Sequence, residues 1–215
     1  MSKTPPEAPK DCPLCPRLVA YRAANARAEP TWFNGPAPSF GDANARLLVV
    51  GLAPGRMGAN RTGRPFTGDY AGELLYGTLK KFGFAKGEYK ADPNDGLTLT
   101  GAMITNAVRC APPENKPTPE EIKTCRPFLS ARMAALPKVK VILALGSIAH
   151  ESVLRAHGMK PSEAKFGHAA ETQLLQGPTL VSSYHCSRYN TQTRRLTTEM
   201  FEAVMARAKA IADAN

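Results

Sequence analysis

The chain has 215 residues, which is enough for one domain with a sizeable core. None of its apolar runs approaches the roughly 18 residues of a membrane-spanning helix, and its polar N-terminus lacks the apolar stretch of a secretory signal, so we expect a cytoplasmic location and no membrane partner. The 28 lysines and arginines against 18 acidic residues give a net charge of +10, which favours a polyanionic partner, nucleic acid before an anionic membrane surface, and fits a nucleoid-associated protein.

The first half of the chain predicts one strand and two helices. In chain order we expect a disordered, proline-rich segment over residues 1–10, a short helix over 12–28, an irregular connection over 29–45, a strand over 46–52, a helix over 71–82 and a polar stretch with a turn over 86–100. The strand is the apolar run Leu47–Val50, which stops abruptly at Gly51. A long glycine loop follows it, and such a backbone can approach a ligand closely, although a purely structural loop would have the same pattern.

The second half alternates strands with helices. In chain order we expect a strand over 102–108, a loop with four prolines over 111–119, a helix over 119–136, a strand over 139–145, a helix over 147–156, a strand over 179–184 and a helix over 197–213. Thr118 is the predicted N-cap of the first of these helices, with Pro119 at its first helical position, and Thr197 or Thr198 caps the last.

Strands that alternate with helices imply a parallel sheet with right-handed crossovers. Strands that are nearly continuous apolar runs are buried on both faces of such a sheet. We therefore predict an α/β fold: a single domain over residues 11–215, with a central four-stranded parallel sheet flanked by helices on both faces. The sequence has no internal repeat and no sign of a second domain.

The five cysteines are Cys12, Cys15, Cys110, Cys125 and Cys186. An odd number in a reducing compartment argues against a disulfide framework. A metal or cluster site is the better interpretation for at least some of them, and four thiolates suit either zinc or an iron–sulfur cluster. Cys186 is the odd one, and we expect it to be a free thiol.

Polar or glycine residues stand where three of the predicted strands end. Gly51 opens the glycine loop, Asn106 lies at the end of the second strand and His185 follows the fourth. A parallel sheet brings these ends to one edge, where ligands bind, and Asp69 of the glycine loop should join them. Each residue alone has a structural explanation, because an asparagine or Asp69 can cap an element and a histidine can be a satisfied core residue. Their convergence favours a functional site.

Four motifs in this chain resemble the uracil-DNA glycosylase superfamily, and more closely its iron–sulfur branch, known as family 5 or type B. The motifs are Gly51-Leu52-Ala53-Pro54-Gly55, RTGRPFTGD from Arg61, TNAVRC from Thr105 and SYHCSRYNTQT from Ser183. The resemblance covers nearly the whole chain, from Cys12 to the last helix. One departure is Cys186, where the family usually has a proline that would stiffen the turn.

The resemblance implies a monofunctional DNA glycosylase, which flips uracil, and other deaminated bases such as hypoxanthine, out of DNA and hydrolyses the glycosidic bond. It implies that His185 directs positive charge to O2 of the departing uracil, that Asn106 reads the pyrimidine edge and that Asp69 aligns the attacking water. Other branches have a polar residue in the first glycine motif, whereas Leu52 and Ala53 cannot orient water.

The resemblance also implies roles for the remaining motif residues. The base pocket takes Gly51, Leu52, Ala53, Pro54, Gly55, Phe66 and Asn190, with the Phe66 ring stacked on the flipped base. Asn190 is also expected to hydrogen-bond within its own loop or to the backbone. Contacts to DNA are expected from Arg61, Arg64, Ser187, Arg188 and Tyr189, of which Arg188 and Tyr189 form a wedge in the duplex. A loop after the second strand holds a 4Fe-4S cluster, with zinc as the less favoured metal, through Cys12, Cys15, Cys110 and Cys125. The protein is expected to act on uracil-containing DNA as a monomer.

Two other functions stay open at this level. A non-catalytic iron–sulfur protein of the same fold could bind DNA lesions, but it would not need Asp69, Asn106 and His185. An unrelated iron–sulfur or zinc protein that binds nucleic acid would contain the metal and release no base.

Overall fold

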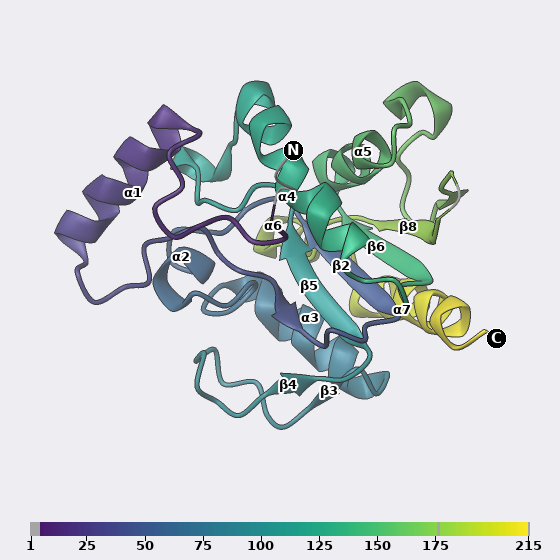
Figure 1. The fold of residues 1–215 in the computed structure, drawn as a ribbon. Coiled ribbons are helices and arrows are strands. Elements are labelled where there is room, and N and C mark those ends of the chain that lie inside the picture. Colours follow the sequence, from purple (N-terminus) through teal and green to yellow (C-terminus); the bar gives the residue numbers. More distant parts are fainter. Residues whose placement is uncertain (1–4, 176, 215) are drawn as a thin grey trace.

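Four parallel strands form the centre of the sheet in the computed structural model, which describes residues 5–175 and 177–214. They lie in the order β5-β2-β6-β8 (Figure 1). Their bounds are Leu47–Gly51 for β2, Ala102–Asn106 for β5, Val141–Leu145 for β6 and Thr179–Ser183 for β8. The predicted four-stranded parallel sheet is therefore confirmed, and each strand ends within two residues of its predicted bounds.

Two short strands extend this sheet at its edges. β1 (Phe40–Gly41) pairs antiparallel with β5, and β7 (Glu171–Gln173) pairs antiparallel with β8, so the whole sheet has six strands. A separate hairpin forms from β3 (Ala85–Lys86) and β4 (Thr98–Leu99), inside a stretch predicted only to be polar with a turn. Strands of two or three residues have no apolar run of their own, so the sequence pattern did not reveal them.

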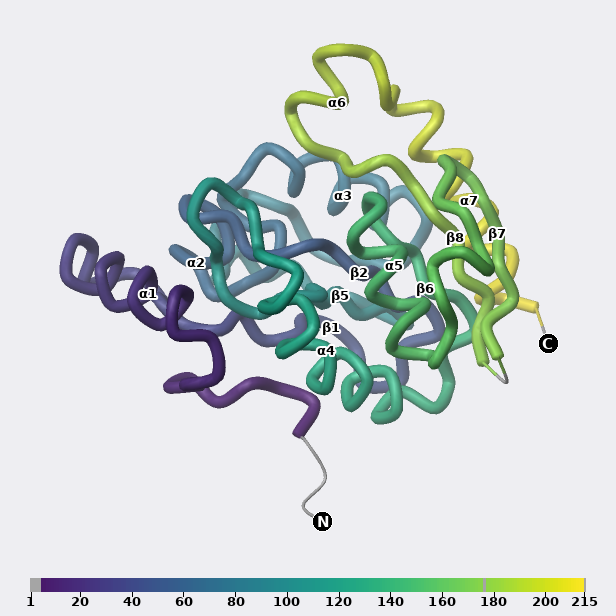
Figure 2. Tube along the Cα trace, turned by 90° about the horizontal axis from the view of Figure 1, so that it is seen from above, coloured from purple at the N-terminus to yellow at the C-terminus, as the bar shows by residue number. Residues whose placement is uncertain are grey.

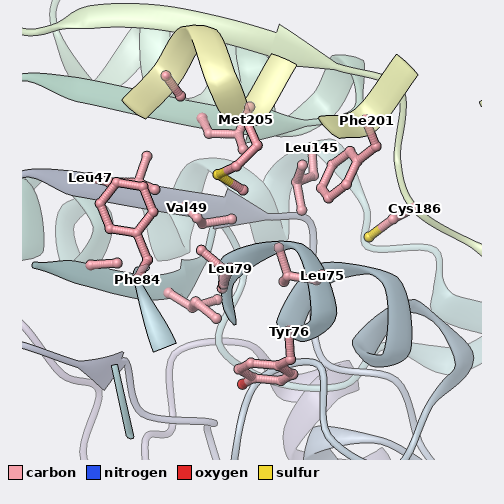
Figure 3. Packing of buried hydrophobic residues seen from close by; sticks show 14 of the residues in the cluster. Leu47, Val49, Leu75, Tyr76, Leu79, Phe84, Leu145, Cys186, Phe201 and Met205 are labelled. Atoms are coloured by element: carbon pink, nitrogen blue, oxygen red, sulfur yellow. The ribbon is translucent and has the colours of Figure 1, made fainter. Parts of the chain in front are cut away.

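Different helices cover the two faces of the sheet, as predicted. One face packs against α3 (Tyr70–Lys81) and α7 (Thr198–Asp213), and the other against α4 (Pro119–Ala134) and α5 (Ser147–Ala156). Successive residues of β2 alternate between these layers, because side chains on a strand point to opposite faces. Leu47 and Val49 belong to the α3–α7 core (Figure 3). Leu48 and Val50 belong to the α4–α5 core.

The remaining helical segments are short or lie outside the layers. They are α1 (Pro16–Ala28), α2 (Ala59–Thr62), α6 (Arg188–Gln192) and the single 3-10 turns η1 (Pro113–Asn115) and η2 (Pro161–Glu163). The predicted caps are confirmed: Thr118 forms a capping box with Glu121 at the start of α4, and Thr197 caps α7. In the described part of the chain, no helix is both long and apolar enough to span a membrane.

The N-terminal segment is tied to the sheet through Glu7. The carboxylate of Glu7 accepts a hydrogen bond from Nη1 of Arg109 at 2.9 Å and also pairs with Arg132 of α4. The Arg109 side chain is only 1% exposed, and a buried guanidinium needs such a partner. Glu7, inside the segment predicted to be disordered, thus makes defined contacts, and residues 1–4 of that segment lie outside the described residues.

We predict that Glu7→Gln lowers the free energy of unfolding by about 1–3 kcal/mol, because it leaves the buried charge of Arg109 without its counter-ion. Urea denaturation of the variant measures this change. Glu114→Gln is the matched control, since Glu114 is exposed and forms its ion pair with the exposed Lys116. That control should change stability by less than about 0.5 kcal/mol, and equal effects of the two substitutions would contradict the prediction.

Candidate active site

A cavity of about 340 Å³ opens at the carboxyl edge of the sheet. Its wall contains ten of the predicted site residues: Leu52, Ala53, Pro54, Gly55, Phe66, Asp69, Asn106, His185, Ser187 and Arg188. The structure thus brings together residues from four separate motifs of the sequence. A larger cavity, of about 690 Å³, lies at the opposite edge of the sheet and is lined by none of these residues.

The floor of the cavity is the junction of β2 and β5. Gly51 and Asn106 are direct partners in the parallel ladder. A Cβ atom on Gly51 would lie 2.5 Å from Oδ1 of Asn106 and 2.7 Å from Cζ of Phe66, so no larger residue fits there. Asn106 is only 3% exposed, and its side-chain amide makes no hydrogen bond to any residue that the structure describes. That amide is therefore free to pair with a ligand in the cavity.

His185 stands across the cavity from this junction, in the turn after β8. Its ring lies nearly parallel to that of Phe66, with ring centroids 5.9 Å apart and an interplanar angle of 27°. Burial lowers the pKa of His185 from 6.5 to about 4. The lowered pKa favours the neutral imidazole, which can donate or accept a hydrogen bond.

Asn190, which was expected in the base pocket, holds the turn that carries His185. Its Nδ2 donates to the carbonyl oxygen of His185 at 2.8 Å, and the cavity wall does not include it. Ser187 has a similar local task, because its hydroxyl accepts from the backbone N–H of Asn190 at the start of α6. These two bonds fix the turn in the place of the missing proline. Cys186 itself is fully buried in the core beside α3 and α7 (Figure 3).

Asp69 both caps a helix and faces the cavity. Its Oδ1 accepts from the backbone N–H of Gly72 at 3.3 Å, so the capping alternative is confirmed. Burial raises the pKa of Asp69, and the hydrogen bonds from the first turn of α3 oppose that rise. A Cβ on Gly58 would lie 2.5 Å from Oδ2 of Asp69, so this glycine leaves the space that the carboxylate occupies.

Asn115 is a cavity residue that the sequence analysis missed. It lies in η1, in the proline-rich loop, with a left-handed backbone (φ 57°) that asparagine tolerates better than most residues. A Cβ on Gly55 would lie 3.7 Å from Oδ2 of Asp69 and 3.8 Å from Oδ1 of Asn115. Two oxygen acceptors therefore approach one point beside Gly55. The only signal in the sequence was an asparagine on a loop that leaves the same edge of the sheet.

Arg61 and Arg64, which were expected to contact DNA, do not line the cavity of the candidate active site. Arg64 is 4% exposed and donates to both carboxylate oxygens of Asp95, at 2.8 and 2.7 Å. It is a structural residue, and its expected contact to DNA is corrected. Arg61 lies outside the candidate active site, in a second cleft with Lys10 and Lys90.

The two expected wedge residues lie on α6, which stands out from the body of the molecule (Figure 2). Tyr189 is 70% exposed, which is unusual for so large a ring. Arg188 reaches back over the cavity rim, where its guanidinium lies 5.3 Å from the ring centroid of Tyr70. Both side chains are accessible to a partner that approaches the carboxyl edge of the sheet.

The four predicted ligand cysteines, Cys12, Cys15, Cys110 and Cys125, line one small apolar cavity. α1 and α4 contribute to it, and Leu18, Val108 and Phe128 are among its apolar lining residues. Two donors point at its sulfur atoms: the backbone N–H of Arg109 at 3.3 Å from Sγ of Cys125, and Nη1 of Arg22 at 3.6 Å from Sγ of Cys110.

Burial raises the pKa of the Cys110 thiol to about 12 and that of Cys125 to about 11. Free thiols in this cavity would therefore stay protonated at pH 7, and only a bound cation or cluster would stabilise their thiolates. Over residues 5–175 and 177–214, no three His, Cys, Asp or Glu side chains are grouped closely enough to hold a metal ion.

The family model of the uracil DNA glycosylase superfamily matches residues 38–209. This chain belongs to the uracil DNA glycosylase superfamily, as its motifs predicted. Within it, the chain is similar to the type-5 uracil-DNA glycosylase of Thermus thermophilus, with 49% identity over 94% of each chain. The type-5 enzyme of Mycobacterium tuberculosis is 40% identical over 94% of this chain and 78% of its own, and that of Pyrobaculum aerophilum is 39% identical over 93% and 88%.

The lowered pKa of His185 predicts a pH dependence of stability. Between about pH 6.5 and 4 the unfolded chain binds a proton at this residue that the folded chain does not, so stability falls as the pH falls through this window. Asp69 acts in the opposite direction, because its pKa is raised above the ordinary value of 3.8, and it does so equally in the wild type and in a His185 variant. The free energy of unfolding, measured by urea denaturation, should therefore fall between pH 7 and pH 4.5 by about 1–3 kcal/mol less in His185→Gln than in the wild type. Parallel stability curves for the two proteins would contradict the assignment of a neutral His185.

Proposed function

We propose that this protein hydrolyses the N-glycosidic bond of uracil in DNA and leaves an abasic site. The carrying observation is the cavity on which Asn106, His185, Asp69 and Phe66 converge. Its volume of about 340 Å³ is near the lower end for ligand pockets and suits one flipped nucleotide. Base excision requires such an extrusion, because the bond to be broken is inaccessible inside the duplex.

Asn106 is the residue that we assign to base recognition. Its unpaired amide has both a donor and an acceptor, which match O4 and N3–H of uracil. Cytosine has an amino group in place of O4 and an unprotonated N3, so it would leave this buried amide facing unmatched groups. The mismatch of a buried polar group is what gives such a site its selectivity. The Phe66 ring supplies an apolar wall beside it.

His185 is assigned to the leaving group. As the glycosidic bond breaks, negative charge develops on O2 of uracil, and a neutral imidazole N–H aimed at this atom stabilises it. The stacking of His185 on Phe66 and the bond from Asn190 to its backbone support a fixed ring, so little reorganisation is needed during the reaction. No proton needs to leave the histidine, because a hydrogen bond is sufficient for a stable uracil anion.

Asp69 and Asn115 are assigned to the attacking water. A water near Gly55 could donate one hydrogen to Oδ2 of Asp69 and one to Oδ1 of Asn115, with its lone pair directed at the sugar. The carboxylate also stabilises the positive charge that develops on the sugar. The raised pKa of Asp69 makes it a better proton acceptor than a solvent-exposed aspartate. Leu52 and Ala53, which line the same cavity, exclude bulk water rather than bind it.

We predict that His185→Ala lowers the single-turnover rate of uracil excision by about 10²–10³, because one preorganised donor to the leaving group is lost. Asp69→Asn should lower it by about 10²–10⁴, while the helix cap survives, since asparagine caps as well as aspartate. The rate of free-uracil release from an oligonucleotide measures both effects. Binding to a duplex with an abasic site should persist in both variants.

Asp213→Asn is the matched control, because Asp213 is the last residue of α7 and forms its ion pairs with Arg46 and Lys209 at the surface. Full excision activity of a folded Asp69→Asn variant would reduce Asp69 to a helix cap and overturn our mechanism. If the wild-type protein binds damaged DNA without releasing any base, the alternative of a non-catalytic DNA-binding protein is correct.

We place the DNA duplex across the carboxyl edge of the sheet, in a complex with one copy of the protein. The exposed ring of Tyr189 and the Arg188 guanidinium suit a wedge that fills the gap left by the flipped base. The second cleft, with Arg61, Lys10 and Lys90, suits phosphates further along a strand. We also propose that the protein excises hypoxanthine, which is supported by the apolar side chain of Leu52 in the first glycine motif. The net charge of +10 supports a nucleoid-associated location.

The four cysteines on the apolar cavity are proposed to hold a 4Fe-4S cluster. The donor set fits: four sulfurs, an apolar surround and N–H donors from Arg109 and Arg22 are features of thiolate-bound iron–sulfur sites. When bound, such a cluster would join the segment before α1 to the loop after β5 and to α4. Hydrolysis moves no electrons, so its role here is structural.

We predict that the protein purified without oxygen contains about four iron atoms per chain and absorbs near 400 nm. Cys110→Ser should lose most of this iron and absorbance, because one of the four thiolates is removed. Cys186→Ser is the matched control and should keep the iron, since Cys186 lies in the α3–α7 core. Stoichiometric zinc in place of iron would refute the cluster and leave a zinc site.

A further inference from the structure

Phe66 has a backbone conformation that residues other than glycine seldom adopt. Its φ angle is 53°, in the left-handed region, where a bulky side chain is strained. Such strain persists only where neighbouring groups hold it, and it is concentrated at functional sites. The Phe66 ring forms part of the cavity wall and packs against His185, so whatever holds the backbone of Phe66 also shapes the cavity.

The hydroxyl of Tyr89 holds this segment from behind. Tyr89 lies between β3 and β4, and its hydroxyl donates to the carbonyl oxygen of Phe66 at 3.0 Å. The same hydroxyl accepts from the backbone N–H of Gly68 at 3.3 Å. Burial raises the pKa of Tyr89 to about 12, so the proton that it donates to Phe66 is retained at neutral pH. One side chain thus fixes the backbone on both sides of Thr67.

The first turn of α3 packs directly on this hydrogen bond. A Cβ on Gly72 would lie 2.0 Å from the carbonyl oxygen of Phe66 and 2.3 Å from Oη of Tyr89. The N–H of Gly72 also donates to Oδ1 of Asp69, the N-cap of α3. The Phe66 carbonyl, the Tyr89 hydroxyl and the Asp69 cap therefore meet at one glycine, and a shift of one displaces the others.

Tyr89 is itself held by groups that do not touch the cavity. Its ring stacks on Tyr76 with centroids 4.8 Å apart, and the hydroxyl of Tyr76 donates to the carbonyl oxygen of Pro65 at 2.6 Å. Asp95 accepts from the backbone N–H of Lys90 at 3.0 Å and pairs with Arg64, which ties the hairpin loop to the glycine loop. The hydroxyl is therefore preorganised before any ligand binds.

We propose that Tyr89 is a positioning residue for base excision, whose hydroxyl holds the Phe66–Asp69 segment so that the ring meets the base and the carboxylate meets the sugar. The proposal rests on the proposed function and goes beyond it, because it assigns the β3–β4 hairpin a part in the reaction. Tyr89 acts through Phe66 and Asp69 and does not touch the substrate.

Tyr89→Phe removes the hydroxyl and keeps the ring stacked on Tyr76. We expect the maximal single-turnover rate of uracil excision to fall about ten- to a hundredfold, as for a small misplacement of reacting groups. The enzyme concentration at half-maximal rate should change by less than about threefold, since the DNA contacts are intact. Tyr21→Phe, on α1, is the matched control, because the Tyr21 hydroxyl makes no hydrogen bond to a described residue, and it should excise uracil at the wild-type rate.

A double-mutant cycle with Phe66→Leu tests whether Tyr89 acts through Phe66. The double variant should lose less than the product of the two single losses, because the Phe66 ring, one of the two groups that the Tyr89 hydroxyl positions, is already absent, while Asp69 remains. Two results would overturn the inference: losses of excision rate that are fully additive in the double variant, or a wild-type rate in Tyr89→Phe. In either case, uracil release by the wild-type protein would still uphold the proposed function. If the wild-type protein releases no uracil, the proposed function fails and this inference fails with it.

Discussion

The parallel pairing of β2 with β5 is the constraint on which the candidate active site depends. The ladder ends at the Gly51–Asn106 pair, and the backbone bonds continue beyond it, from the N–H of Ala107 to Gly51 and from that of Val108 to Leu52, both at 2.9 Å. A slip of one residue would turn every side chain of β5 to the other face and move the Asn106 amide into a helix layer. Backbone hydrogen bonds, rather than contacts between side chains, therefore set the floor of the cavity.

The central sheet, its helices and most of the cavity wall could be predicted, because apolar runs buried on both faces are visible in sequence and parallel topology gathers strand ends at one edge. Arg64 could not be predicted correctly, since its partner Asp95 lies 31 residues away and an arginine in a glycine loop fits a phosphate contact equally well. Asn115 was missed because only tertiary packing brings the proline-rich loop to Gly55. The ionisation of His185 depends on burial by distant elements, which no local pattern records.

Burial acts on the two ionisable groups of the cavity with opposite sign. It lowers the pKa of His185 and raises that of Asp69, and both changes disfavour charge in the cavity. The helix start at α3 counteracts this for Asp69 alone, because its N–H groups and the helix dipole stabilise a carboxylate. The cavity therefore combines a neutral donor at one side with a carboxylate that the helix start partly supports at the other, which matches the direction in which charge separates when a glycosidic bond breaks.

The tie between Glu7 and Arg109 joins positions 102 residues apart, and the cysteine cavity joins Cys12 and Cys15 to partners that are similarly distant. A ribosome delivers the N-terminal segment first, so this segment has no partner until β5 and α4 have emerged. Contacts of such sequence separation form late and slowly in folding. For most of its synthesis the chain thus carries the exposed thiols of Cys12 and Cys15 and an unattached α1. During this interval the thiols are most open to oxidation and the segment to binding by a chaperone.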